Sequence, residues 1–127
     1  MLRISLGLCL ALCFACASPT GGRFGEYETI IRAEWKVAQD RLAVLGVERS
    51  SKVPPDICKF EAREGRITTD VTAAGWTNGL FYPSSFRIVW NVETPGVLRH
   101  EAGHAILLFL DYDCWDCYEH ECGPCPR

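Results

Sequence analysis

Apolar residues recur at helical spacing in residues 24–45, the longest regular pattern in the first half of the chain. The apolar and aromatic side chains there fall three or four positions apart: Tyr27, Ile30, Ile31, Trp35, Ala38, Leu42 and Leu45. No proline interrupts the pattern, and Gly46 follows it as a residue suited to end a helix. The pattern predicts an amphipathic helix over residues 24–45.

Shorter apolar stretches, separated by turn residues, follow in the middle of the chain. The segments "ICKFEA" and "RITTDVTA" predict two short strands around a turn at Glu64-Gly65. The segment "FRIVWN" at residues 86–91 is rich in β-branched and aromatic residues and predicts a further strand. Thr94 and Pro95 then predict the N-cap and first residue of a helix reaching about Leu110. The order of helix, short mixed or antiparallel sheet, helix and cysteine-rich tail predicts an α+β fold.

The first 17 residues have the pattern of a secretory signal peptide. Arg3 provides the positive start, "ISLGLCLALCFA" the apolar segment, and small residues follow. A run of about a dozen apolar residues is too short to span a bilayer comfortably. Two interpretations of its end remain open: Ala15-Cys16-Ala17 fits cleavage before Ser18, whereas Ala15-Cys16 resembles the lipobox of bacterial lipoproteins, from which Cys13 and Phe14 depart. In both, residues 1–17 direct export, so we expect a lipoprotein anchored at Cys16 or a periplasmic or secreted protein.

Residues 18–25 are expected to form a tether and residues 26–127 a single domain. A mature chain of about 110 residues is long enough for one core and too short for two. The net charge of −3 is spread without any basic block, which argues against a nucleic-acid partner. We expect a monomer without a nucleic-acid partner, which a lipid anchor attaches to the membrane if Cys16 is lipidated.

Five cysteines remain once the signal segment is set aside: Cys58, Cys114, Cys117, Cys122 and Cys125. The last four form two CxxC pairs, but the gap between the pairs is well short of the roughly 15–20 residues typical of a zinc ribbon. Outside the cytoplasm, disulfides within the tail or from the tail to Cys58 are favoured over a cysteine metal site. Two bridges and one free thiol is the simplest count, and the pairing stays open.

The second predicted helix carries His100-Glu101-Ala102-Gly103-His104, an HExxH motif. Residues four apart on a helix share one face at about 5–6 Å, so both imidazoles can reach one ion, and neutral imidazole suits zinc. Glu101 is rotated by about 100° from His100, so it borders the metal and can take a proton from a zinc-bound water. The competing interpretation is a chance match, which would leave four ring nitrogens on this helix in need of other partners.

"FRIVWN" followed by "GVLRHEAGHAILL" resembles the zincin metallopeptidases, in which an edge strand precedes the HExxH helix. Residues 84–120 also resemble small uncharacterised bacterial HExxH lipoproteins with acidic residues and a later histidine. The resemblance implies a zincin-like fold, His100 and His104 as zinc ligands, and Glu101 as general base and acid. It also implies that the edge strand binds an extended peptide by strand addition.

A third zinc ligand is expected because catalytic zinc usually has three protein ligands. The metzincin extension of the motif is absent, since Leu107 and Leu110 occupy its positions. His120 is the remaining histidine, with Glu119 and Glu121 as alternatives, and bridges in the tail would hold it near the helix. Asp111 and Asp113 are expected to accept the second ring N–H of a ligating histidine, or else to end the helix on a wet surface.

These expectations combine into a zinc-dependent hydrolase of peptide bonds that acts on a peptide or protein substrate at the cell envelope or outside the cell. Two alternatives remain: a catalytically inactive zincin-like binding lipoprotein, and a disulfide-stabilised envelope interaction module with an incidental HExxH. Tyr82, Tyr112 and Tyr118 are candidate donors to the reacting oxygen, although packing is the favoured role for each.

Overall fold

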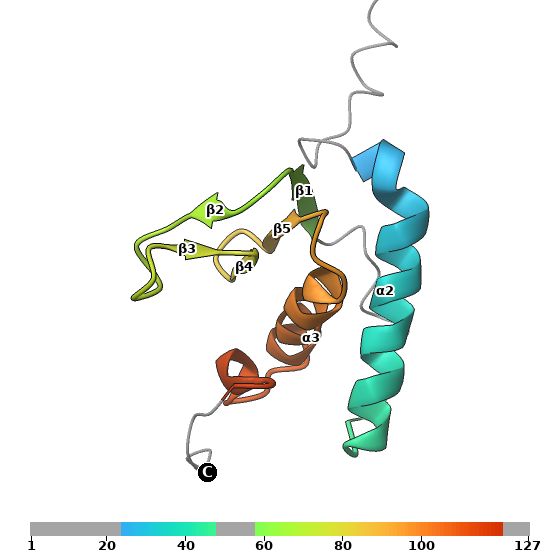
Figure 1. Cartoon of the computed structure of the whole chain (residues 1–127). Helices are drawn as coiled ribbons and strands as arrows, with labels where there is room; N and C mark the ends of the chain where they lie inside the picture. The colour runs from blue at the N-terminus through green and yellow to red at the C-terminus, as the bar shows by residue number, and fades with distance from the viewer. Residues whose placement is uncertain (1–23, 48–57, 121–127) are drawn as a thin grey trace, which may run out of the picture.

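The computed structural model describes residues 24–47 and 58–120 (Figure 1). The elements are helix α2 (Phe24–Val44), strands β1 (Lys59–Arg63), β2 (Ile67–Thr68), β3 (Trp76–Thr77), β4 (Gly79–Tyr82) and β5 (Arg87–Asn91), helix α3 (Val97–Phe109) and the 3-10 helix η2 (Trp115–Cys117). The described part is thus a small α+β structure with two α-helices and a short mixed sheet, which confirms the expected class. No helix in these ranges is long and apolar enough to cross a membrane.

Helix α2 forms because its apolar positions line one face that packs against α3 and the sheet. Ile31, Trp35, Ala38 and Leu42 on that face are buried, and the helix ends just before Gly46, which has a φ of 88°. Val47 N–H donates to the Leu42 carbonyl at 3.0 Å and closes the last turn. The predicted helix is confirmed to within one residue at its end.

The main sheet has the strand order β1-β5-β4, with β5 parallel to β1 and antiparallel to β4. The two strands predicted around Glu64-Gly65 exist, but β1 pairs with β5, and β2 pairs with β3 in a separate two-stranded ribbon. Strands β3 and β4 were not predicted. They are two and four residues long, and β4 begins at a glycine, so neither shows a readable alternation of apolar and polar residues.

Strand β5 corresponds to the predicted "FRIVWN" strand, but it lies in the centre of the sheet and is not an edge strand. Ile88, Val89 and Trp90 are all buried, which is the continuous apolar pattern of a strand covered on both faces. The edge strand that contacts α3 is β4 instead. The expectation that residues 86–91 form an edge strand was therefore wrong.

Helix α3 lies between α2 and the sheet (Figure 1). It begins at Val97, and its N-cap is Gly96 in the left-handed region with a φ of 84°, so the predicted N-cap at Thr94 was wrong. Thr94 instead accepts a hydrogen bond from the Asn91 side-chain amide at 3.2 Å, which ties the connection to the end of β5. All residues from Glu101 to Leu107 are buried, so α3 is the central helix of the described structure.

The cysteines of the described part have different states. Cys58 is a free thiol, 1% exposed, in the core, so the candidate bridge from the tail to Cys58 is not formed. Burial raises the pKa of this thiol to about 12. Cys114 and Cys117 are disulfide-bonded, but no bridge joins two described residues. Cys122 and Cys125, like Cys16 and the expected signal and tether, lie outside the described residues, so the pairing stays a prediction.

Candidate metal centre

His100 and His104 project from one face of α3 into the same space. Their Nε2 atoms are 3.0 Å apart, and the two rings meet edge to face at a centroid distance of 4.6 Å. The arrangement follows from the helix, which brings residues four apart onto one face. Residues 101–107 of α3 are buried, so the helix that carries these imidazoles is held in the core.

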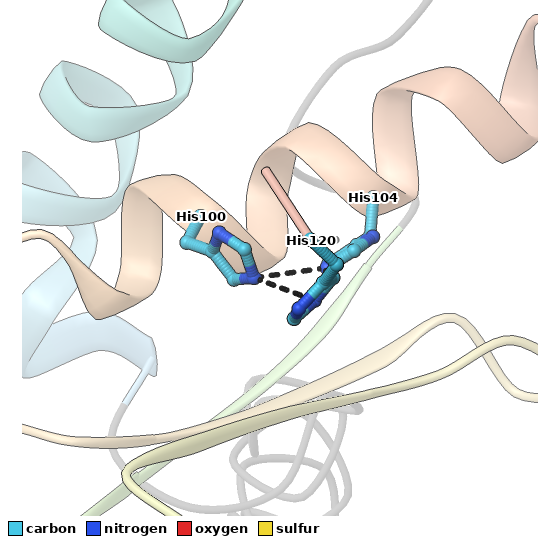
Figure 2. Close-up of side chains that lie close together, drawn as sticks. All are labelled: His100, His104 and His120. Atoms are coloured by element: carbon cyan, nitrogen blue, oxygen red, sulfur yellow. Dashed lines mark hydrogen bonds between the residues drawn. The ribbon is translucent and has the colours of Figure 1, made fainter. Parts of the chain in front are cut away.

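His120 comes from the tail and completes a triangle with the two helix histidines. Its Nε2 lies 3.1 Å from the Nε2 atoms of both His100 and His104 (Figure 2). A turn returns the chain: Glu119 adopts a left-handed φ of 58°, and His120 N–H donates to the Cys117 carbonyl at 2.9 Å. The three histidines are close enough to bind one metal ion. The ligand nitrogens of a tetrahedral zinc site lie about 3.3 Å apart, which these distances approach.

The second nitrogens of the two helix histidines face hydrogen-bond acceptors. His104 Nδ1 lies 2.7 Å from the Trp115 carbonyl oxygen, and His100 Nδ1 lies 3.3 Å from Glu119 Oε2. Because those acceptors require an N–H on Nδ1, the lone pair of each neutral ring is on Nε2. Nitrogen lone pairs that converge on one point repel each other unless a cation lies between them. The donor set therefore fits a cation that prefers imidazole.

The Glu119 carboxylate contacts His100 Nδ1, which is one of the two roles expected for Asp111 and Asp113. Its second oxygen, Oε1, forms an ion pair with Arg41 of α2 at 2.8 Å. Asp111 and Asp113 are exposed, and neither carboxylate bonds to any of the three described histidines. Of the two roles expected for these acids, their exposure agrees with exposed residues at the end of the helix and not with partners of a histidine. Glu121, the other acidic alternative for a third ligand, lies outside the described residues.

Glu101 lies on the side of α3 that contacts strand β4. Its side chain is 7% exposed and accepts a hydrogen bond from the Phe81 backbone N–H. A Cβ atom built on Gly79 would overlap Val97 Cγ1 and come 2.9 Å from Glu101 Oε1, so the glycine leaves room for both side chains. Burial raises the pKa of Glu101 to about 7, and the Phe81 N–H opposes the shift. A carboxyl group with that pKa can both accept and return a proton near neutral pH.

His104 is held in the neutral form that metal binding requires. Burial lowers the pKa of His104 to about 4, while its hydrogen bond to the Trp115 carbonyl acts in the opposite direction. The neighbouring His100 and His120 also lower it. The ring is therefore neutral above about pH 5, and its Nε2 is available to a cation without prior loss of a proton.

Tyr118 packs beneath the histidines and explains the glycine in the HExxH motif. A Cβ atom at Gly103 would overlap the Tyr118 ring, so the aromatic side chain, and not another backbone segment, occupies the space. The ring stacks on His100 at a centroid distance of 5.8 Å and meets His104 edge to face. Burial raises the pKa of the Tyr118 phenol to about 12, and its hydroxyl donates to Glu119. Tyr118 thus links α3 to the turn that carries His120.

The three histidines and Glu101 open into one cavity of about 740 Å³. Strand β4, the β2–β3 ribbon and the start of α3 form its walls, and Arg41, Asp116 and Glu119 also line it. Tyr82 and Tyr112 do not line it: Tyr82 stacks under the Arg87 guanidinium at 4.2 Å, and Tyr112 is 44% exposed. The volume lies within the range typical of small-molecule and peptide subsites.

Replacement of Glu101 by glutamine is expected to stabilise the metal-free protein at pH 8 and to have little effect at pH 4.5. Folding raises the pKa of Glu101 from 4.5 to about 7, so the folded state favours the protonated form. The free energy of unfolding of the glutamate protein therefore falls as the pH rises from about 4.5 to about 7, where the folded carboxyl group also ionises. The glutamine removes the cost of a buried charge, worth about 2–3 kcal/mol at pH 8. Urea unfolding of both zinc-free proteins at the two pH values measures the difference. An equal difference at both values would contradict the raised pKa.

No protein family, curated protein or solved structure matches this chain. The candidate centre is therefore described by its own geometry: three histidine nitrogens that converge on one point, and a buried glutamate beside them, at the end of a cavity.

Proposed function

We propose that the protein is a zinc-dependent hydrolase of peptide bonds with a zincin-like domain. The observation that carries the proposal is the convergence of His100, His104 and His120 within 3.1 Å of one another, with Glu101 buried at the next position of α3 and lining the same cavity. Three histidines would hold the ion and leave a fourth position open towards the cavity, which is the ligand number of catalytic zinc sites. Bound zinc would polarise the scissile carbonyl and lower the pKa of water.

Glu101 supplies the proton transfers in this proposal. Its carboxylate takes a proton from the attacking water and returns it to the leaving amine, the two halves of general base and acid catalysis. A pKa of about 7 suits both steps at neutral pH. The hydrogen bond from the Phe81 N–H fixes the carboxylate against β4, so its position does not depend on the substrate.

Strand β4 is the surface on which an extended peptide would lie. It is the edge of the main sheet beside α3, and Gly79, Leu80 and Phe81 line the cavity next to the histidines. Because the Gly79 backbone groups are hydrogen-bonded to the Thr77 hydroxyl and the Phe81 N–H to Glu101, an extended chain would lie against this strand through side-chain contacts more than through strand pairing. This role was expected of residues 86–91 and passes to β4, because β5 has neighbours on both sides.

The remaining parts of the proposal concern the setting of the enzyme. Residues 1–17 direct export, with a lipid anchor at Cys16 or free secretion, and the protein works as a monomer. Bridges among Cys114, Cys117, Cys122 and Cys125 hold the tail so that His120 stays at the centre, which matches the disulfide-bonded state of the first two.

A peptide digest with the metal as the variable tests the function. The purified mature protein is incubated with a peptide library after zinc loading, after removal of zinc by a chelator, and after return of zinc. We expect cleavage in the first and third samples and not in the second, with about one zinc per chain when loaded. Loaded protein that binds zinc and cleaves no peptide would reject the hydrolase and leave a metal-binding protein.

A further inference from the structure

The β2–β3 ribbon, residues 67–77, lies on the side of the described structure away from α2 (Figure 1), and Val71, Thr72, Trp76 and Thr77 line the cavity of the metal centre. Its turn is closed by its own hydrogen bonds: Thr69 N–H donates to the Gly75 carbonyl at 3.1 Å, Gly75 N–H to the Thr72 carbonyl at 3.0 Å, and the Thr72 hydroxyl to the Trp76 carbonyl at 2.9 Å. The ribbon therefore has a defined shape before any ligand arrives. That shape sets the outer wall of the cavity.

Two large apolar side chains of the ribbon are exposed, and both line the cavity that contains the histidines and Glu101. Val71 is 69% exposed and Trp76 is 37% exposed. Leu80, Pro95 and Val97 add apolar surface to the same walls. Apolar side chains that cluster in one cavity typically contact a ligand. Single exposed apolar side chains elsewhere on a protein surface are common and carry no such meaning.

Trp76 is held in place by a charged neighbour. The Arg66 guanidinium, from the residue just before the ribbon, lies 3.8 Å from the centroid of its ring in a cation–π contact. The indole is therefore an oriented surface and not a freely turning side chain. An oriented aromatic surface costs little conformational entropy when a ligand packs on it.

The charged residues that line the cavity come from α2, α3 and the tail, and not from the ribbon. They are Arg41, Glu101, Asp116 and Glu119, with Arg41 and Glu119 paired at 2.8 Å. The cavity wall on the ribbon side contains Val71, Thr72, Trp76 and Thr77, none of which is charged. The ribbon end of the cavity is therefore uncharged in its own lining side chains, although the Arg66 guanidinium packs on the Trp76 ring.

We propose that the ribbon end of the cavity is a subsite for a large apolar or aromatic side chain of the substrate, with Val71 and Trp76 as its specificity-determining residues. The inference rests on the proposed peptide hydrolysis and names its substrate class: peptides with leucine, phenylalanine or a similar residue adjacent to the scissile bond. Discrimination by an apolar pocket of this kind is about 10- to 200-fold in kcat/KM.

The test compares matched peptides that differ at one position, leucine or phenylalanine against aspartate or serine. Wild type is expected to prefer the apolar peptides, and Val71→Asp and Trp76→Ala are each expected to reduce kcat/KM for them by at least about 10-fold while zinc content stays the same. The matched control is Val44→Asp at the end of α2, where the valine is 87% exposed and away from the cavity. That control should behave as wild type. Equal cleavage of polar and apolar peptides by wild type, or an unchanged preference in both ribbon variants, would overturn the subsite and leave the hydrolase standing.

A binding measurement distinguishes failure of the subsite from failure of the proposed hydrolase activity. Leucine and aspartate hydroxamates supply the same zinc-binding group with different side chains, and calorimetry on the zinc-loaded protein reads their affinities. We expect tighter binding of the leucine compound to wild type and loss of that preference in Val71→Asp. If no peptide is cleaved and the preference is present, only the proposed function fails; if the two hydroxamates bind equally, the subsite is rejected.

Discussion

Replacement of Glu101 by glutamine is expected to reduce peptide hydrolysis by about 10²- to 10⁴-fold and to leave about one zinc per chain. The glutamine has the shape of the glutamate and can still accept the Phe81 N–H, so the packing of α3 against β4 should be kept. It cannot take a proton from water. Because the three histidines supply the metal ligands in the proposal, zinc should bind as before while the proton transfer is lost.

The matched control for this substitution is Glu28→Gln on α2. Glu28 is about half exposed and pairs with Arg32 one helical turn away, so the same chemical change there removes only a surface ion pair. Zinc content is measured by elemental analysis and turnover with a cleaved library peptide. Hydrolysis that survives in Glu101→Gln at the wild-type rate would exclude Glu101 as the base, and Asp116 or Glu119 in the same cavity would be tested next.

The parts of the fold that the sequence predicted are those in which the pattern is local. Helix α2 shows its apolar face over many residues in succession, and HExxH places two ligands within a single turn of helix. The β2–β3 ribbon and β4 are short, and their pairing depends on partners elsewhere in the chain. Strands β3 and β4 and the pairing of β2 with β3 escaped prediction, although the ribbon and β4 form much of the cavity wall.

The surroundings of the metal centre needed the structure for the same reason. Glu119 contacts His100 from 19 residues away, and its other oxygen pairs with Arg41 on a helix much earlier in the chain. The sequence placed the acidic partner at Asp111 or Asp113 because they follow the motif closely. The one available signal was Gly103, whose missing side chain indicated a close neighbour, but only the structure identifies Tyr118 as that neighbour.

Replacement of both His100 and His104 by alanine is expected to abolish stoichiometric zinc binding and, with it, all hydrolysis. The double substitution removes two of the three converging nitrogens, and His120, which is exposed, cannot hold the ion alone. Loss of a residue that only supports a ligand typically costs 10- to 100-fold in metal affinity, so loss of two ligands should exceed about 100-fold. Zinc affinity is measured by competition with a chromophoric chelator.

A second variant, His100→Gln with His104→Gln, separates ligand loss from loss of structure. Glutamine fills more of the space beside Tyr118 and offers an amide to the Trp115 carbonyl, so unfolding in urea should stay closer to wild type while zinc is lost as completely.

The opposing hypothesis places the ion on the tail cysteines. It requires stoichiometric zinc in both double variants and tighter binding after reduction, because reduction frees thiolates at Cys114 and Cys117. The histidine centre requires the reverse: no zinc in either variant, and weaker binding by reduced wild type, because the turn that carries His120 is then no longer held by its bridges.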